Sequence, residues 1–281
     1  MTATLKEIRG KTERYFISKG VPNAKLDADL IIAHCLGIKR LDIYLSLERP
    51  IYEQELNAIR NCVRRRGQRE PLQYILGYTE LFNYRLKVDP RALIPRQETE
   101  YLIELCLPLV VNQARVLDLG TGSGAIALVI AMERPGISVL AVDKHETALS
   151  LAIENAAALE VGERVDFLIS DWFDQVPKEK KYDLIVSNPP YLTDTELKTA
   201  EPEVSQFEPK QALISQEEGL FDLKKIIEKA PSFLAENGWL VVETGLNQKV
   251  ALEDHARALG YQKVSTEKDL LNRDRFLLMQ I

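Results

Sequence analysis

One short stretch of the chain joins an apolar strand to a small-residue helix through a glycine-rich turn, and it constrains the fold most. It reads Arg115-Val116-Leu117-Asp118-Leu119-Gly120-Thr121-Gly122-Ser123-Gly124-Ala125-Ile126-Ala127. Glycines at such a turn let the main chain approach a ligand closely at a helix start. Gly120, Gly122 and Ala125 fit the dinucleotide pattern G-x-G-x-x-G/A, so the turn alone does not separate a nicotinamide cofactor from S-adenosylmethionine. Asp118 and Gly124 favour the methyl donor, whose cationic end needs no pyrophosphate cradle.

Two further strands are predicted to end in side chains suited to a nucleoside. Ser138–Asp143 ends in a carboxylate placed to accept hydrogen bonds from ribose hydroxyls. Val165–Ile169 is followed by Asp171 and Trp172, whose carboxylate and indole suit the amino group and the face of an adenine. Trp172 is also compatible with an ordinary half-buried aromatic. In a parallel α/β sheet, ligands bind beyond the carboxyl ends of the strands, so these residues are expected to lie together.

The run Ser187-Asn188-Pro189-Pro190-Tyr191 follows a fourth apolar strand, Tyr182–Val186. Two prolines fix φ, favour extended geometry before them and remove backbone donors, which leaves a rigid edge of acceptors. The Asn188 carboxamide and the Pro189 carbonyl can accept both N–H groups of a planar NH2 and leave its lone pair facing an electrophile. Read alone, the run is equally typical of a strand stopped by proline with Asn188 in a turn. Its expected place beside the glycine turn favours binding of an amide or aromatic amine.

The combination resembles the class I S-adenosylmethionine-dependent methyltransferases, and within them the HemK/PrmC-type glutamine-N5 methyltransferases that modify peptide chain release factors. The resemblance covers nearly the whole chain. Besides Asn188–Tyr191, it includes Glu70–Gly77, Leu93–Glu100, Phe207–Pro209, Ala212-Leu213 and Gly219-Leu220. The family usually has proline where this chain has Gln97, and glycine where it has Asn272. Asparagine tolerates positive φ better than most residues, so the second departure is mild.

The resemblance implies a Rossmann-like, seven-stranded and mostly parallel sheet with one reversed strand at its edge. It also implies S-adenosylmethionine as cofactor and S-adenosylhomocysteine as product. With the strand-end carboxylates added, the expected cofactor-binding residues are Asp118, Gly120, Thr121, Gly122, Ser123, Gly124, Asp143, Asp171, Trp172 and Asn188. The expected substrate-binding residues are Asn188, Pro189, Pro190 and Tyr191, of which Asn188, Pro189 and Tyr191 are expected to be catalytic. Tyr191 is expected to pack on the plane of the substrate amide, and no strong base is expected.

The chain is long enough for two domains, because 281 residues exceed the ~100 to 200 typical of one. Thr4 and Glu7 resemble a capping box that starts a helix ending at Gly20, and Asn23 is expected to cap the next. A later helix runs into Arg64-Arg65-Arg66. We expect a helical substrate-recognition domain over residues 1–76, a β-hairpin linker with its turn at Asn83 over 77–94, and a methyltransferase domain over 95–281.

Composition indicates a soluble cytoplasmic enzyme without a metal site. No uncharged apolar run approaches the ~20 residues that cross a bilayer, and the first turns carry charges rather than a signal-peptide core. Cys35, Cys62 and Cys106 are isolated and odd in number, which favours buried reduced thiols over a disulfide framework or a zinc cluster. The histidines show no ligand spacing.

Charge divides unevenly along the chain. Residues 1–95 carry 17 Lys and Arg against 11 Asp and Glu, whereas residues 96–281 carry 19 against 31. A basic helical module suits an acidic protein surface or a nucleic acid backbone, although Arg64 to Arg66 are equally typical of a solvated helix carboxyl end. The acidic second part disfavours a phosphate-rich substrate.

Three functions are therefore compared. The favoured one is methylation of a glutamine side chain in a protein, namely the GGQ-loop glutamine of release factors. The second is methylation of an exocyclic amine of adenine or guanine in DNA or RNA, after extraction of the base. The third is a noncatalytic adaptor, which the intact glycine turn and the intact Asn188 motif disfavour. Leu192–Gln216 is expected to be a helix-poor loop that covers the substrate entrance.

Overall fold

The computed structural model describes residues 3–281, which divide into two compact units. The first unit comprises the chain up to Tyr78 together with Glu201–Phe207. The second comprises Thr79–Ala200 and Glu208–Ile281. The expected domain limits at residues 76 and 94 stay predictions. No described helix reaches the length and apolar character needed to cross a membrane.

The first unit consists of helices packed around two apolar clusters. Its helices are α1 (Leu5–Ser18), α2 (Ala24–Leu36), α3 (Arg40–Leu45), α4 (Glu53–Gly67), α5 (Leu72–Leu76) and α10 (Pro202–Phe207). Fully buried Ile31, Ile32 and Ile59 belong to these clusters. Burial of branched aliphatic side chains on facing helices is the main source of stability for such a bundle.

The helix ends of the first unit agree only in part with the predicted caps. At α1 the capping box is present, because Thr4 Oγ1 accepts from the Glu7 N–H at 3.3 Å and Glu7 Oε2 accepts from the Thr4 N–H at 3.3 Å. Asn23 occupies the position before α2, but its side chain makes no capping hydrogen bond. The prediction is therefore confirmed for the position of the N-cap residue, while the side-chain hydrogen bond that a cap would make is absent.

Arginines at the end of α4 hold α10 in the first unit by ion pairs. Arg66 Nη1 donates to Glu203 Oε1 at 2.7 Å, and Arg69 donates to both Glu203 oxygens at 2.7 and 2.6 Å. Arg66 is only 5% exposed and also pairs with the buried Asp27. The expectation of a fully solvated arginine run is therefore wrong for Arg66, because its charge is neutralised by carboxylates from distant parts of the chain.

Two of the three cysteines are neighbours in the first unit, although they lie far apart in the sequence. The sulfur atoms of Cys35 on α2 and Cys62 on α4 lie 3.6 Å apart, whereas Cys106 is buried in the second unit. The description of all three as isolated thiols holds for Cys106 and is wrong for the other two. Helix packing, which spacing does not encode, brings them together.

The hairpin and the sheet form as predicted, with small shifts. Strands β1 (Tyr78–Leu81) and β2 (Tyr84–Lys87) flank Phe82 and Asn83, both at positive φ. The sheet contains β3 (Arg115–Leu119), β4 (Ser138–Asp143), β5 (Val165–Ile169), β6 (Tyr182–Ser187), β7 (Leu234–Glu243), β8 (Lys263–Lys268) and β9 (Asp274–Gln280). Their spatial order is β5-β4-β3-β6-β7-β9-β8.

The reversed strand lies one place inside the sheet rather than at its edge, which corrects the prediction. β9 is antiparallel to both β7 and β8, while β3 to β7 pair in parallel. Burial explains the order, because β9 buries Phe276–Met279 whereas β8 is largely exposed and carries Lys263 and Lys268. A charged, exposed strand is suited to an edge because it discourages pairing with other chains.

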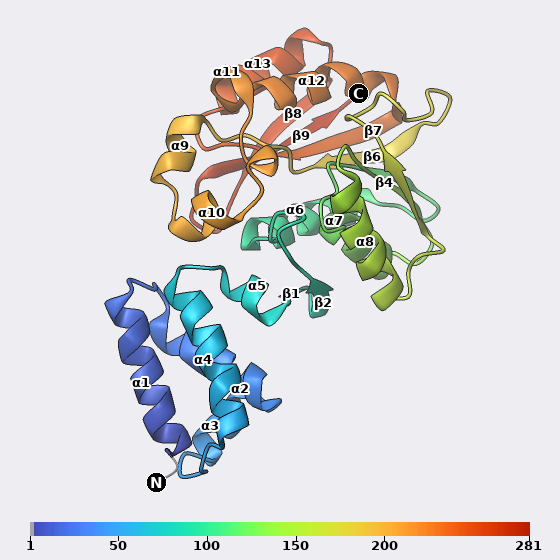
Figure 1. Ribbon diagram of the computed structural model, residues 1–281. Coiled ribbons are helices and arrows are strands. Elements are labelled where there is room, and N and C mark those ends of the chain that lie inside the picture. The colour runs from blue at the N-terminus through green and yellow to red at the C-terminus, as the bar shows by residue number, and fades with distance from the viewer. Residues whose placement is uncertain (1–2) are drawn as a thin grey trace. The chain divides into compact units, whose positions relative to one another are not determined.

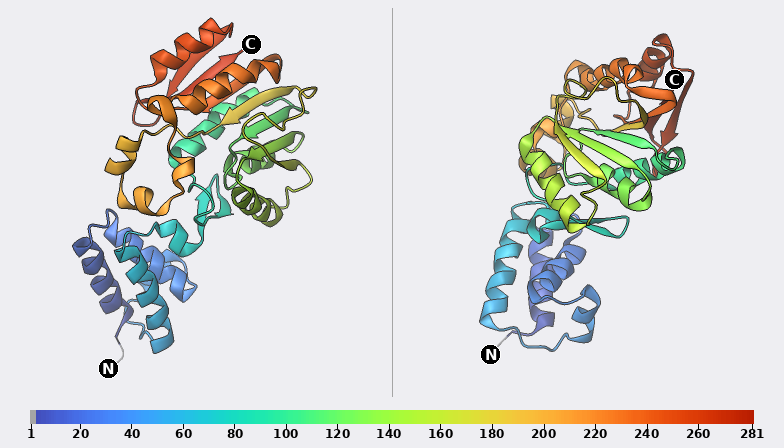
Figure 2. Two further views of the ribbon diagram at one scale, coloured as in Figure 1. Left: turned by 45° about the horizontal axis from the view of Figure 1, so that its top comes forward. Right: turned by 90° about the vertical axis from the view of Figure 1, so that its right-hand side faces the viewer.

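Helices cover both faces of the sheet in the second unit (Figures 1 and 2). One face packs against α6 (Gln97–Cys106), α7 (Ala125–Glu133) and α8 (Glu146–Ala158). The other packs against α12 (Phe221–Lys229) and α13 (Lys249–Ala258). Along β3, Val116 faces the first group while Leu117 and Leu119 face the second, as the alternation of a strand requires. The chain returns from β5 to β6 beside β3, which creates a crevice at the carboxyl ends of these strands.

The segment after Tyr191 contains more helix than its composition predicts. It forms α9 (Asp194–Thr199), α10 and a short 3-10 helix over Lys210–Ala212. Thr193 and Glu196 form a capping box at α9, with the Glu196 N–H donating to Thr193 Oγ1 at 3.1 Å. The expectation of a helix-poor loop is therefore wrong, since the capping residues outweigh the low helix propensity of the surrounding sequence.

Candidate active site at the carboxyl ends of the strands

A cavity in the second unit lies at the carboxyl ends of β3, β4, β5 and β6. The residues contributed by these four strand ends are Gly120, Thr121, Gly122, Ser123, Asp143, Lys144, His145, Ser170, Asp171, Trp172, Asn188 and Pro190. Most of the side chains predicted for a nucleoside and for a planar nitrogen therefore border one space. Parallel pairing of neighbouring strands places their ends on a common edge, which explains the convergence.

The glycine turn takes backbone conformations that other residues adopt poorly. Gly120, Gly122 and Gly124 have φ values of +72°, +58° and +83°. A Cβ on Gly120 would lie 3.2 Å from the Trp172 ring, and one on Gly124 would lie 2.9 Å from Leu128. Gly120 and Gly122 border the cavity, whereas Gly124 precedes α7 and packs against helices. The turn thus exposes main chain to the cavity where a side chain would fill the space.

The Asp143 carboxylate is oriented by two main-chain donors. Its Oδ2 accepts from the Gly122 N–H at 3.0 Å, and its Oδ1 accepts from the His145 N–H at 2.9 Å. Asp143 borders the cavity and is 8% exposed. Each oxygen keeps further acceptor capacity, so a fixed carboxylate faces the space where vicinal hydroxyls of a ribose would donate.

Asp118, in contrast, lies beneath the turn rather than in the lining of the cavity. Its Oδ2 accepts from Thr121 Oγ1 at 2.6 Å and from the Ala127 N–H at 3.2 Å, and the side chain is fully buried. Burial raises the pKa of the Asp118 carboxyl to about 7. The contacts indicate that Asp118 supports the shape of the turn, and its predicted contact with a cofactor stays a prediction.

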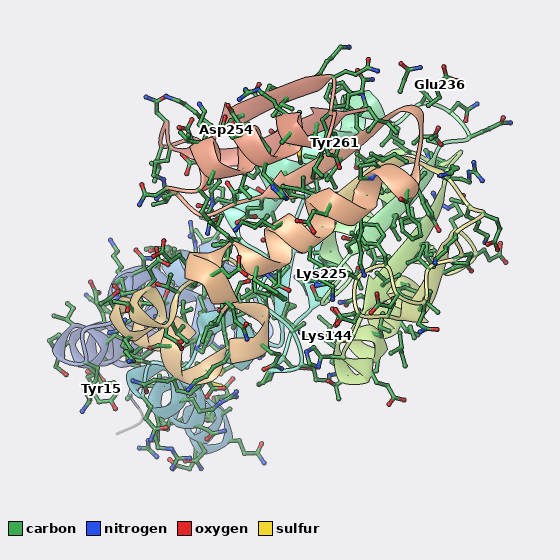
Figure 3. All side chains as sticks on the ribbon, turned by 90° about the horizontal axis from the view of Figure 1, so that it is seen from above. Tyr15, Lys144, Lys225, Glu236, Asp254 and Tyr261 are labelled. Atoms are coloured by element: carbon green, nitrogen blue, oxygen red, sulfur yellow. The ribbon has the colours of Figure 1, made fainter. Side chains whose placement is uncertain are left out.

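The end of β5 presents an indole and a carboxylate that α12 holds in place. Trp172 is 7% exposed and adopts φ +53°, and the Ser170 hydroxyl donates to its carbonyl at 2.9 Å. Lys225, labelled in Figure 3, donates from α12 to Asp171 Oδ2 at 3.1 Å. A non-glycine residue at positive φ is uncommon, and such strained residues cluster at ligand-binding sites.

The Asn188 motif meets the cavity through Asn188 and Pro190. No described residue forms a hydrogen bond with the Asn188 carboxamide, so its oxygen and NH2 are available to a ligand. Beneath it, the Ser187 hydroxyl donates to the Leu119 carbonyl at 2.7 Å, which links the end of β6 to the end of β3. Pro189 is not among the residues that border this cavity.

Tyr191 is anchored away from the cavity by a buried pair of charges. Its hydroxyl donates to Glu243 Oε1 at 2.8 Å and accepts from Arg275, whose guanidinium lies 4.6 Å from the centre of the tyrosine ring. Burial, reinforced by the Glu243 charge, raises the pKa of the Tyr191 phenol, so the hydroxyl stays protonated. Its predicted packing on a substrate amide stays a prediction, whereas its anchoring role was missed.

Two further stretches, residues 91–99 and 209–212, also line the cavity; they overlap segments that bore the family resemblance, although none of their residues was assigned to the site. Their lining residues are Arg91, Ala92, Leu93, Pro95, Thr99, Pro209, Gln211 and Ala212. Arg96 forms an ion pair with the buried Glu208, which ties one segment to the other. The motifs Leu93–Glu100 and Phe207–Pro209 were the signal that could have found them. Asn272 adopts φ +62°, as its replacement of glycine predicts.

No group of His, Cys, Asp and Glu side chains within residues 3–281 has the arrangement of a metal site. The polar lining of the cavity consists of two carboxylates, several hydroxyls, the amides of Asn188 and Gln211, the basic side chains of Arg91, Lys144 and His145, and main-chain N–H groups. A convergent set of this kind suits an organic ligand with a ribose and an amine.

Comparison with known proteins agrees with this architecture. The model of the PrmC N-terminal domain matches residues 7–77, and the model of the methyltransferase small domain matches residues 98–206. Among solved structures, a methyltransferase from Pyrococcus furiosus aligns with a TM-score of 0.54 at 18% identity over 71% of this chain and 90% of the other. The 16S rRNA N2 G1207 methyltransferase of Thermus thermophilus aligns with a TM-score of 0.52 at 19% identity over 72% and 49%. At these identities the likeness concerns the fold.

Curated relatives are similar over almost the whole chain. The release factor glutamine methyltransferase of Geobacter sulfurreducens is 36% identical over 97% of this chain and 95% of its own length. Those of Fusobacterium nucleatum and Shewanella oneidensis are 38% and 40% identical, over 97% and 90% of this chain and 77% and 88% of their own. The chain belongs to the release factor glutamine methyltransferase family.

Proposed function

We propose that this protein transfers the methyl group of S-adenosylmethionine to the side-chain amide nitrogen of the GGQ-loop glutamine in a peptide chain release factor. The observation that carries the proposal is the shared cavity of the glycine turn, Asp143, Trp172 and a carboxamide, Asn188, that has no partner among the described residues. One end of this space suits a nucleoside and the other a planar NH2. The kinship to named release factor glutamine methyltransferases supports the choice of glutamine.

The lining fits the methyl donor on chemical grounds. Asp143 offers acceptors to ribose hydroxyls, the exposed main chain at Gly120 and Gly122 leaves room for a close approach, and Trp172 offers an indole to an adenine. When bound, S-adenosylmethionine would supply a methyl group activated by its sulfonium charge. The product remaining in the cavity would be S-adenosylhomocysteine.

Asn188 and Pro189 would hold and orient the substrate amide. Their oxygens accept from the two N–H groups, so the nitrogen lone pair is directed at the methyl carbon. Positive charge grows on that nitrogen during transfer, which makes its N–H groups stronger donors. The acceptors therefore bind the transition state more tightly than the ground state, and no strong base is required before transfer. Water can take the proton afterwards.

A transfer assay with labelled S-adenosylmethionine tests the proposal. The protein is incubated with release factor, with release factor whose GGQ glutamine is replaced by asparagine, and with DNA or RNA. We expect one methyl group on the glutamine side chain, located by peptide mass spectrometry, and no label in the other samples. Label on nucleic acid alone would establish the exocyclic-amine activity instead, and label on release factor that persists without the glutamine would reject the site.

A further inference from the structure

Asp222, in the first turn of α12, contacts two parts of the second unit that the active site depends on. Its Oδ1 accepts from the Trp172 Nε1–H at 3.1 Å. Its Oδ2 accepts from the Ser215 hydroxyl at 2.6 Å, and its own N–H donates to Ser215 Oγ at 3.1 Å. Hydrogen bonds to a carboxylate are stronger than those between neutral groups, so one side chain restrains both partners.

On the cavity side, the hydrogen bond from Trp172 Nε1–H to Asp222 sets the position of the Trp172 ring. The indole packs against Gly120, where an added Cβ would lie 3.2 Å from the ring, and the indole borders the cavity. Trp172 Nε1 is the only polar atom of that side chain, and a buried indole N–H needs an acceptor. Without Asp222 the ring would lose the bond that selects its orientation.

On the other side, Ser215 links Asp222 by hydrogen bonds to the main chain that follows Tyr191. The Ser215 N–H donates to the Leu192 carbonyl at 3.0 Å, and the Leu192 N–H donates to the Leu213 carbonyl at 2.9 Å. This pairing joins Leu213–Ser215 to the end of the Asn188 motif as a short parallel bridge. Ser215 is 5% exposed, so its three hydrogen bonds, two with Asp222 and one with Leu192, lie within the protein.

The turn between Ser215 and Asp222 packs closely against Tyr191, the last residue of the Asn188 motif. Glu217, Glu218 and Gly219 have φ values of +50°, +57° and +82°, three consecutive residues in the left-handed region. A Cβ on Gly219 would lie 2.0 Å from the Tyr191 carbonyl oxygen, and Gln248 Nε2 donates to that oxygen at 3.2 Å. Two non-glycine residues in this conformation cost free energy, which surrounding contacts must offset. The Ser215–Asp222 pair closes the turn.

We infer that Asp222 is a positioning residue that fixes the Trp172 side of the cofactor cavity and the main chain of the substrate-binding motif together. Through Trp172 it acts on the affinity for the methyl donor. Through Ser215 and Leu192 it acts on the alignment of Asn188–Tyr191. The inference rests on the proposed function, which it extends by a residue outside the cavity lining.

Four variants separate the two contacts. Trp172→Phe removes the indole N–H together with part of the ring that borders the cavity, and Ser215→Ala removes only the hydroxyl, while Asp222→Ala removes both side-chain contacts and leaves the indole in place. Asp222→Asn keeps an acceptor for Trp172. Asp174→Asn is the matched control, because Asp174 pairs with Lys229 of α12 at 2.9 Å and, within the described residues, forms no hydrogen bond with Trp172 or Ser215.

Donor binding is measured first and without turnover, by isothermal titration of each variant with S-adenosylmethionine. We expect the Kd to rise about tenfold in Asp222→Ala, as the loss of one hydrogen bond to a charged group implies, and at least tenfold in Trp172→Phe, which also loses ring surface. We expect it to change less than threefold in Ser215→Ala, Asp222→Asn and the control. A wild-type protein that does not bind the donor would defeat the proposed function itself, whereas unchanged binding in Asp222→Ala would defeat only the role of Asp222.

Steady-state methylation then tests the substrate side. With saturating donor, we expect kcat/KM for the protein substrate to fall about tenfold in Ser215→Ala and in Asp222→Ala, and to stay within threefold of wild type in Trp172→Phe. If Asp222 had only a structural role, its substitution would lower the unfolding temperature and the active fraction. The effects on S-adenosylmethionine affinity and on substrate kcat/KM would then not separate between the variants. Equal losses of donor affinity and of substrate kcat/KM in every variant would overturn the inference.

Discussion

The Tyr191 hydroxyl donates a hydrogen bond to Glu243 Oε1 at 2.8 Å, which joins the end of the Asn188 motif to the end of β7. Glu243 is 2% exposed and pairs with Arg275 of β9 at 3.0 Å. Tyr191 is thus restrained by a buried ion pair from two other strands. A substrate-binding motif needs such support, because a small displacement of acceptor atoms lowers the rate of an aligned transfer.

Removal of the Tyr191 hydroxyl should lower turnover without weakening cofactor binding. In Tyr191→Phe the Glu243–Arg275 pair remains, but the ring loses both hydrogen bonds. We expect kcat for the release factor to fall roughly tenfold, because the end of the motif is held less firmly, while the Kd of S-adenosylmethionine is unchanged. Kinetics and isothermal titration measure the two. Tyr182→Phe is the control, because the buried Tyr182 hydroxyl has no partner among the described residues. A similar loss in both variants would contradict the anchoring role.

Two glycines with similar backbone conformations should differ in their effect on activity. Gly219 has φ +82°, and a Cβ added there would lie 2.0 Å from the Tyr191 carbonyl oxygen. Gly260 has φ +90°, and a Cβ added there would have no atom within 4 Å. Alanine at either position should cost ~1 to 2 kcal/mol of stability through the left-handed conformation, and at Gly219 the overlap with the main chain adds to that cost. Only Gly219→Ala should also displace the motif and lower kcat/KM at least tenfold. Thermal unfolding and kinetics test this, and full activity of Gly219→Ala would refute it.

Asn188→Ala should largely abolish methylation without preventing cofactor binding. The Asn188 side chain is expected to accept a hydrogen bond from the substrate amide. Most of the residues expected to contact S-adenosylmethionine lie elsewhere in the cavity. We expect the Kd of S-adenosylmethionine to stay within about tenfold of wild type, a change of at most ~1.4 kcal/mol. Asn247→Ala, an exposed asparagine of the same unit, serves as the control. Turnover at the wild-type rate in Asn188→Ala would remove the basis of the proposed mechanism.

The buried carboxyl of Asp118 predicts a pH dependence of stability. Its pKa rises from 3.8 to about 7 in the folded protein, mainly through burial. The folded state therefore binds more protons than the unfolded state between these values, and the free energy of unfolding falls as pH rises through that window. The full effect is on the order of 4 kcal/mol, because one pKa unit corresponds to ~1.4 kcal/mol.

Asp118→Asn removes this titration while keeping an acceptor for Thr121 and Ala127. Urea unfolding at about pH 5 and pH 8 should show that the variant gains stability relative to wild type at the higher pH. The comparison between the two proteins cancels the other titrating groups. A difference in unfolding free energy that is the same at both pH values would show that Asp118 does not titrate in this range.

Local sequence patterns predicted the elements and the content of the strand ends. Short apolar runs identified the strands of the sheet, and the glycines at Gly120, Gly122 and Gly124 do take the positive φ that makes glycine necessary there. Because parallel strands end at a common edge, the polar residues after each strand converge on one cavity. These features depend on neighbours in sequence, so they can be read from it. The roles assigned to the cavity residues remain predictions for the experiments above.

The supporting contacts were decided only by the tertiary structure. Tyr191 meets Glu243 and Arg275 through a sheet order that places β9 beside β7, and Asp222 meets Trp172 across 50 residues of sequence. Cys35 and Cys62 become neighbours, and α10 joins the first unit, for the same reason. Periodicity reports which face of an element is buried, whereas the identity of its partner depends on packing between distant segments. The sequence alone determined what each strand end carries, and the packed fold determined what holds it in place.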